Sequence, residues 1–308
     1  METQTQGNFK GKGALDAFLN LFVLISLGWL SFSVGQLVFG IINKAFKNNT
    51  FSGYGYDLSI QSGLRMGIAS AIILLPVFLI IINVLHHQYK KGTLSHGSGI
   101  NRWLTYLMLL VSALTVIGSL VALLVNFLNG EYTVNIVLKI ITVLVIALLI
   151  FGYFGYDLRR KEYAKRSMLS IIALILVLVF VIGSIAGAFF FMDSPKTSKL
   201  KRFDMTRSSD LSSLNGYIAS KYMENKKLPD INDSQVTSFK DPETQKPYEY
   251  KVIDDKQYEL CANFAFAVTD TEKYPGSEDW FNHLAGYQCF TKKALDSNLN
   301  PVEKPIIR

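Results

Sequence analysis

Five polar side chains lie at about the same depth within long apolar segments of this 308-residue sequence. They are Gln36, Arg65, Asn126, Asn135 and Lys139. The two positive charges among them could bind an anion or a lipid head group if the segments cross a membrane. The alternative is that each long side chain reaches the membrane surface or caps a helix end. We expect a polar site in the outer half of a helical bundle if these side chains converge.

Other residues that could carry chemistry form no catalytic pattern in this sequence. It contains no Gly-x-Ser-x-Gly elbow, no HExxH pair and no Walker-type phosphate loop. The group of His86, His87 and His96 indicates a solvated interfacial cluster rather than a metal site. His283, near Trp280, is expected at a surface or an edge. We therefore expect no enzyme activity, no cofactor and no metal.

Both cysteines of the chain, Cys261 and Cys289, lie in its hydrophilic C-terminal part. An oxidising compartment would allow them to form a disulfide. Closing that loop would stabilise a small domain by about 3–4 kcal/mol on the chain-entropy model. The alternative is a pair of buried free thiols.

Hydropathy locates the helices that must position these residues. Residues 168–192 carry no charge over a length that crosses a hydrocarbon layer as a helix. The predicted spans are residues 17–42, 63–85, 103–128, 132–156 and 168–192. Half of the residues are hydrophobic, which together with these long uncharged runs excludes an ordinary soluble protein. The sequence predicts an α-helical integral membrane bundle of five transmembrane helices, followed by a small α+β soluble domain.

Small and polar residues mark two helix faces within the spans. In the first span, residues Asp16, Asn20, Gly28, Ser31 and Gly35 recur at helical spacing and predict a face that packs on neighbouring helices. In the fifth span, the Gly183-x-x-x-Gly187 pattern indicates a helix contact, either within the chain or between two copies.

Lysine and arginine are distributed unevenly among the loops. The loops after the second and fourth spans, with the N-terminal segment, hold Lys10, Lys12, Lys90, Lys91, Arg102, Arg159, Arg160, Lys161, Lys165 and Arg166. The loops after the first and third spans hold Lys44 and Lys47. The positive-inside rule places the N-terminus in the cytoplasm and the C-terminal domain outside. We attribute the net charge of +7 to this topology rather than to nucleic-acid binding.

The C-terminal part predicts one helix and an antiparallel sheet. Leu211, Leu214, Ile218 and Tyr222 recur at offsets of three and four, which predicts a helix over residues 206–225. Asp193-Ser194-Pro195 is expected to end the fifth span. Alternation at Tyr248, Tyr250 and Val252, and again at Tyr258, Leu260, Ala262 and Phe264, predicts a hairpin that packs on this helix. The segment around Cys289 could add a third strand. The predicted parts are a four-span domain (1–166), an anchor helix (167–193) and an extracytoplasmic domain (194–308).

The membrane part resembles an uncharacterised bacterial membrane family, the domain of unknown function 5671. The resemblance covers roughly residues 14–160. Its residues are AlaLeuAspAlaPheLeuAsn at 14–20, LeuArgMetGlyIleAla at 64–69 and GlyTyrAspLeuArgArg at 155–160. The resemblance implies a location in the bacterial cytoplasmic membrane and implies no activity.

The C-terminal part resembles the globular domains of type II secretion pseudopilins and related pilins. The residues that carry this resemblance are Arg207, Asp210-Leu211, Tyr222, Leu228-Pro229, Asp241-Pro242, Tyr248, Tyr250 and Tyr258. The resemblance implies a helix packed on a small antiparallel sheet and a partner among envelope or secretion-system proteins. The fifth span lacks the glutamate of a pilin stem. The resemblance therefore does not imply that this protein polymerises as a pilin does.

Two functions are consistent with these features. The first is a non-enzymatic multi-pass protein that anchors and displays an extracytoplasmic, partner-binding domain. The second is a small transporter or channel component with a polar site in the outer half of the bundle. The expected environment is the lipid bilayer, without nucleic acid, and the oligomeric state stays open.

Overall fold

The computed structural model describes residues 12–46, 54–91, 99–130, 133–159, 168–268 and 279–294. It divides into two units. The first is a helical bundle that ends at Met192, and the second comprises the chain from Asp193 onward with the beginning of the second helix, up to Ser59.

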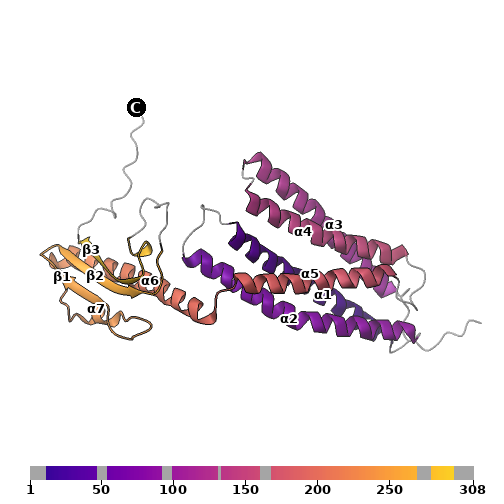
Figure 1. Ribbon diagram of the computed structural model, residues 1–308, viewed down its shortest axis with the longest axis horizontal. Helices are drawn as coiled ribbons and strands as arrows, with labels where there is room; N and C mark the ends of the chain where they lie inside the picture. Colours follow the sequence, from indigo (N-terminus) through magenta and orange to yellow (C-terminus); the bar gives the residue numbers. More distant parts are fainter. Residues whose placement is uncertain are drawn as a thin grey trace, which may run out of the picture. The chain divides into compact units, whose positions relative to one another are not determined.

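Within the described residues, the bundle consists of five helices, which Figure 1 shows. They are α1 (Lys12–Ala45), α2 (Tyr54–Lys90), α3 (Gly99–Leu128), α4 (Val134–Arg159) and α5 (Met168–Phe191). All five are long enough and apolar enough to cross a membrane. The predicted five-helix bundle is therefore confirmed, and the protein is a multi-pass integral membrane protein.

Helix α2 begins earlier than its hydropathy predicts. It starts at Tyr54 instead of residue 63, so the second half of the expected polar loop is helical. Asp57 lies in its first turn, where a carboxylate is favourable near the positive end of the helix dipole. Ile60 and Gln61 are buried, and the Gln61 side chain donates a hydrogen bond to the carbonyl of Phe191 at 3.2 Å. The N-terminal turns of α2, from Tyr54 onward, thus precede the span that hydropathy predicted.

Glycines allow close helix packing in the bundle at Gly67, which the sequence patterns did not indicate, and at Gly187, which the Gly183-x-x-x-Gly187 pattern did indicate. A Cβ added at Gly67 would lie 2.8 Å from Cδ2 of Leu37 and 3.2 Å from the carbonyl oxygen of Ser33. Helices α1 and α2 are therefore in close contact at this point. A Cβ at Gly187 would lie 3.1 Å from Ile41, which places Gly187 against α1. At Gly183 an added Cβ would meet nothing within 4 Å.

The small face predicted for the first span is only partly correct. Asp16 and Asn20 are buried. An added Cβ at Gly28 or Gly35 would meet nothing within 4 Å, so these glycines do not pack on a neighbouring helix. The side of α1 that packs closely on α2 instead contains Ser33, Leu37 and Gly40.

The second unit is an α+β domain, as predicted. Its described elements are α6 (Pro195–Asn225), α7 (Ser234–Ser238), β1 (Glu249–Val252), β2 (Gln257–Phe264), the 3-10 helix η1 (Asp279–Phe281) and β3 (Gly286–Lys293). The strands form an antiparallel sheet in the order β1-β2-β3. Figure 1 shows the sheet beside α6, which contacts β2.

Helix α6 begins where the fifth span ends. The expected break at Asp193-Ser194-Pro195 is confirmed, but the helix starts at Pro195 rather than at residue 206. The Ser194 hydroxyl accepts a hydrogen bond from the backbone N–H of Thr197 at 3.1 Å, and Pro195 occupies the first turn, where no N–H donor is needed. The same three residues therefore end one helix and start the next.

The core of the domain lies between α6 and the inner face of the sheet. The predicted stripe of Leu211, Leu214, Ile218 and Tyr222 is buried, as are the alternating residues of β2. Val252 is 44 % exposed, contrary to the predicted alternation, because β1 ends there. The short helix α7, which Asp233 caps, was not predicted.

Candidate functional site

The structure does not gather the five predicted polar residues into one site. The Asn126 side chain donates to the carbonyl of Ala122 on its own helix at 2.8 Å. The buried Asn135 donates to the carbonyl of Phe46, just beyond α1, at 3.1 Å. Gln36 lines a groove between α1 and α2, away from the cavity that Asn126 lines between α3 and α4. Arg65 on α2 and Lys139 on α4 are half-buried.

Polar side chains converge instead at the opposite end of the bundle. There α1 and α3 begin and α2 and α4 end, and their side chains line a partly open cavity of about 140 Å³. We call it the polar cavity, and define it by its polar lining residues Asn20, His86, Tyr89, Asn101, Thr105, Tyr153 and Asp157. Four helices thus contribute polar groups to one cavity.

Hydrogen bonds organise the wall of the polar cavity. The Asn20 amide donates to the Asp16 carboxylate at 2.8 Å, and the Tyr89 hydroxyl donates to the Asn20 side-chain oxygen at 3.2 Å. Asp16 and Asp157 are only 4 % and 9 % exposed. The chain of contacts joins α1 to α2 and orients Asn20.

A second cavity shares a wall with the first. It is an apolar cleft of about 180 Å³ between α1, α2, α4 and α5. Both cavities are lined by Leu27, Phe78, Ile82, Tyr153 and Phe154. We call the second one the apolar cleft. The polar cavity and the apolar cleft therefore share a wall.

Two residues on the rim of the apolar cleft are exposed. Leu149 of α4 and Leu176 of α5 line it and are 54 % and 53 % exposed. The cleft therefore opens at the surface of the bundle, where lipid chains surround a membrane protein.

The sequence contained part of the signal for the polar cavity. Asp16, Asn20 and Asp157 all lie in the motifs on which the family resemblance was based, but each was assigned to a loop or a packing face. His86 was expected in a solvated cluster and is half-buried in the cavity wall. His87 is exposed, and His96 lies outside the described residues.

The C-terminal domain buries its charges in a closed ion cluster. Arg207 donates to Asp204 at 2.9 Å, to Asp241 at 2.5 Å and to Glu243 at 2.9 Å. Asp204, which is fully buried, also accepts the backbone N–H groups of Ala265 and Phe266. Burial opposes ionisation of Asp241, but the bonds from Arg207 and two backbone N–H groups hold its pKa below the ordinary value.

Three buried tyrosines attach the sheet to other parts of the domain. The hydroxyls of Tyr248, Tyr250 and Tyr258 donate to Asp210 at 2.8 Å, to the carbonyl of Pro229 at 3.2 Å and to Asn215 at 2.6 Å. Burial raises the pKa of Tyr250 to about 12. The tyrosines on which the pilin resemblance was based therefore make contacts within the domain. Arg207 and Asp241, which also carried that resemblance, pair with each other in the ion cluster.

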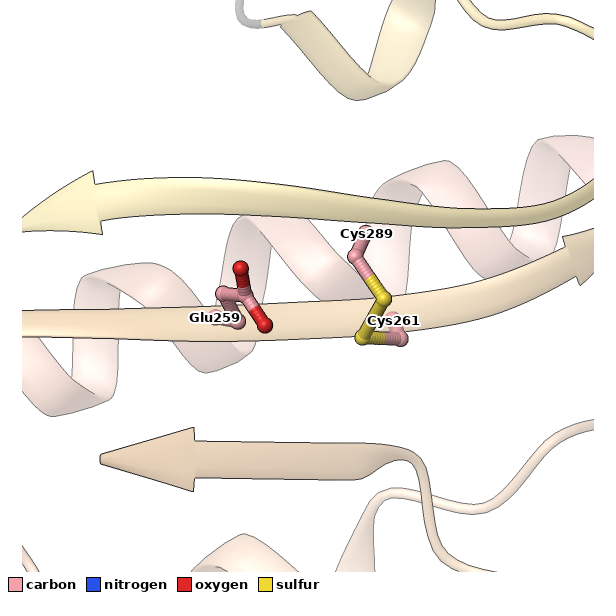
Figure 2. Close-up of side chains that lie close together, drawn as sticks. All are labelled: Glu259, Cys261 and Cys289. Carbon is pink, nitrogen blue, oxygen red and sulfur yellow. A yellow bond between two sulfur atoms is a disulfide. The ribbon is translucent and has the colours of Figure 1, made fainter. Parts of the chain in front are cut away.

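The disulfide predicted between Cys261 and Cys289 is present. The two residues are directly opposite each other on β2 and β3, with a Cα–Cα distance of 4.1 Å. Cys261 alternates with the inward-facing Leu260 and Ala262, so the disulfide lies on the outer face of the sheet (Figure 2). The free-thiol alternative is therefore wrong.

Glu259 lies beside the disulfide on the same face (Figure 2). One of its oxygens and the two sulfur atoms lie within 4.8 Å of one another. Metal binding by cysteine requires thiolates, so these three side chains could act as a ligand set only after reduction.

His283 is not the surface residue that the sequence suggested. It is 4 % exposed and stacks on Phe264 with a centroid distance of 3.6 Å. Its Nδ1 lies 3.2 Å from the carbonyl of Leu284. Burial lowers its pKa below 6.5, so the imidazole is a neutral part of the core.

Comparisons with known proteins describe the membrane part alone. Residues 16–154 match the model of a family described as "Domain of unknown function (DUF5671)". This range contains most of α1, all of α2 and α3 and most of α4, with the polar cavity except for Asp157. No curated protein and no solved structure matches the chain.

Proposed function

We propose that this protein is a non-enzymatic anchor that displays its C-terminal domain on the outer side of a bacterial cytoplasmic membrane, where the domain binds a protein partner. The disulfide on the outer face of the sheet carries this proposal. Disulfides persist in oxidising compartments and are rare in the cytosol. The excess of lysine and arginine in the loops after α2 and α4 supports the same orientation.

The architecture of the domain supports a role in binding rather than in catalysis. Its buried charges are occupied by Arg207 and by backbone groups, which is typical of structural clusters. Val252 and Ile253, next to the β1–β2 turn, are 44 % and 52 % exposed. The pilin-like sequence features suggest an envelope or secretion-system protein as the partner.

Cysteine labelling in intact cells tests the orientation. Lys91, after α2, and Ser220, on α6, are both exposed. A membrane-impermeant maleimide should label Ser220→Cys in intact cells, and should label Lys91→Cys only after the membrane is opened. The unsubstituted chain, whose cysteines are both in the disulfide, is the control. Labelling of both positions only after opening would overturn the proposal.

Crosslinking tests the partner. A photoreactive residue at Ile253 should give one discrete product in membranes, whereas the same residue at the exposed Ser213 on α6 should not. Loss of the product in a Val252→Asp background would assign the contact to the exposed apolar residues next to the β1–β2 turn. The absence of any product at Ile253 would count against a partner at this surface.

The transporter alternative has less support in its original form, because Gln36, Asn126 and Asn135 lie in separate surroundings. A proteoliposome flux assay of Arg65→Gln and Lys139→Gln tests it. Flux equal to that of the unsubstituted protein would discard a role for these two charges.

A further inference from the structure

We propose that the first turns of α6 bind the head groups of anionic phospholipids in the leaflet next to the C-terminal domain. The binding surface consists of Lys196, Lys199 and Arg202, which we call the basic ridge. This inference goes beyond the proposed display of the domain, because the basic ridge holds α6 to the bilayer and needs no protein partner. It applies to whichever leaflet lies next to the domain.

The three side chains of the basic ridge are exposed and follow one another along α6. They occur at offsets of three, and side chains three positions apart form a continuous row on a helix surface. Among the described residues, no carboxylate lies within ion-pair distance of any of them. The Lys199 ammonium lies 5.3 Å from the centroid of the Phe203 ring, which orients this side chain but leaves its charge.

The neighbouring cation of the same turns is treated differently by the fold. The Lys201 ammonium lies 2.6 Å from a carboxylate oxygen of Asp57 and 2.6 Å from one of Asp193, and all three residues belong to the second unit. The domain therefore supplies carboxylates to a cation of α6 that it uses internally. From the part of the chain that the structure describes, it supplies none to the basic ridge.

Positive charges at this place act against the helix itself. The N-terminus is the positive end of the helix dipole, where carboxylates are favourable and cations are not. The first turn of α6 contains Lys196 and no acidic residue, and like charges one turn apart repel each other. An anion outside the domain would offset both costs, and the helix dipole would add to its attraction.

The chain itself holds the basic ridge beside the membrane. Only Met192, Asp193 and Ser194 separate α5 from α6, so the Cα atoms of Phe191 and Pro195 are at most about 15 Å apart. A head-group layer of about 5–7 Å covers each side of the hydrocarbon core, and the ends of long basic side chains reach toward it. Anionic lipids attract lysine and arginine that lie directly next to a span. An acidic protein would match the charge equally well, but the bilayer is the anionic surface to which α6 is tethered.

Fluorescence quenching in nanodiscs tests the basic ridge. The full-length protein carries a fluorophore at Thr206→Cys, an exposed position one turn beyond Arg202, and both native cysteines are protected in the disulfide. The nanodiscs contain phosphatidylcholine alone or equal parts of phosphatidylcholine and phosphatidylglycerol. We expect the acrylamide quenching constant to be at least about twofold lower with phosphatidylglycerol, and this difference to vanish at about 0.5 M salt, where the Debye length is about 4 Å. Equal quenching in both lipids at low salt would overturn the proposal.

Two matched triple variants separate the basic ridge from net charge. The first combines Lys196→Gln, Lys199→Gln and Arg202→Gln, and should abolish the dependence on phosphatidylglycerol. The second removes the same charge from exposed positions elsewhere in the domain and should keep the dependence; it combines Lys227→Gln, Lys240→Gln and Lys256→Gln. Equal loss in both variants would assign the effect to net charge and overturn the proposal.

A charge-retaining variant keeps the test decisive if glutamine disturbs the start of α6. It combines Lys196→Arg, Lys199→Arg and Arg202→Lys, and should respond to phosphatidylglycerol as the unsubstituted protein does. Thermal unfolding of each variant identifies those that are folded. Undiminished dependence in the folded glutamine variant of the basic ridge, or lost dependence in the folded charge-retaining variant, would contradict the proposal.

Discussion

The bundle and the C-terminal domain bury the same kinds of polar side chain in opposite ways. In the domain, Asp204 is fully buried and accepts hydrogen bonds from Arg207 and from two backbone N–H groups. In the bundle, Asp157 and Asn20 are buried at the wall of a cavity. The polar groups of the domain therefore hold its fold together, whereas those of the bundle lie beside a cavity that four helices line.

The largest expected effect removes the centre of the closed cluster. Arg207→Met should destabilise the C-terminal domain by about 3–5 kcal/mol, because Asp204 and Asp241 would remain buried without their cation. Urea-dependent pulse proteolysis of the full-length protein, read from cleavage within the domain, measures the loss. Arg202→Met, at an exposed position of the same helix, should change stability by less than about 0.5 kcal/mol.

The same cluster predicts a pH dependence. The pKa of Asp241 lies below its ordinary value of 3.8 in the folded domain. The cluster therefore contributes its full stability above about pH 4 and loses it as the pH falls through the lowered value. If Arg207→Met kept the acid sensitivity of the unsubstituted domain, the cluster would not be its source.

The disulfide should have the next largest effect, again confined to the domain. It spans 28 residues, and the double substitution Cys261→Ser, Cys289→Ser should cost about 3–4 kcal/mol. Because the disulfide lies outside the core, hydrogen exchange should still show a protected β2–β3 ladder. Reduction of the unsubstituted protein should reproduce the shift, and loss of all sheet protection would show that the disulfide is needed for the fold itself.

In the bundle, close helix packing at Gly67 should contribute to stability. Gly67→Ala places a methyl group against Leu37 and the Ser33 carbonyl and should cost about 1–3 kcal/mol. Gly28→Ala, whose new methyl group meets nothing within 4 Å, is the matched control and should not destabilise. The midpoint of heat-induced aggregation in detergent measures both, and equal midpoints would contradict the close α1–α2 contact.

The smallest effect concerns His283, a titratable residue in the core. Its pKa is lowered by burial from the ordinary 6.5, so the unfolded chain binds a proton more readily than the folded one. Stability is then full above about pH 6.5 and falls as the pH drops toward the lowered value. His283→Gln should flatten this part of the pH profile, measured by the same pulse proteolysis, and an unchanged profile would assign it to another group.

In both parts of the molecule, the features that the sequence predicted correctly are those that leave a burial pattern. Hydropathy located all five spans, and alternation located the hairpin that includes Tyr258 and Leu260, because both patterns reflect burial against one face. The pairing of Cys261 with Cys289 was predicted because the chain has two cysteines and both lie in the part that is expected outside the cytoplasm. The starts of α2 and α6 were missed, since Tyr54–Ser59 and Pro195–Met205 are polar helices without an apolar stripe for hydropathy to detect.

The predicted polar residues Gln36, Asn126 and Asn135 lie in separate surroundings for a physical reason. Depth along a span can be read from residue position, which is why Arg65, Lys139 and their neighbours were grouped. The rotation of each helix about its axis decides whether two residues at one depth meet, and rotation depends on close contacts such as that of Gly67 with Leu37. Asn20 and Asp157, which line the same cavity, are 137 positions apart in the chain, from the difference of their numbers (157 − 20), and no local pattern brings them together.

The two sulfur atoms on the outer face of the sheet differ in how an attacking thiol would meet them. Cys289 is exposed and Cys261 is 2 % exposed, so an incoming thiolate reaches the Cys289 sulfur and expels the sulfur of Cys261. The departing anion would then form in a poorly hydrated position beside the Glu259 carboxylate, which makes it an unfavourable leaving group. The disulfide should therefore exchange slowly with added thiols, although one of its two cysteines is exposed.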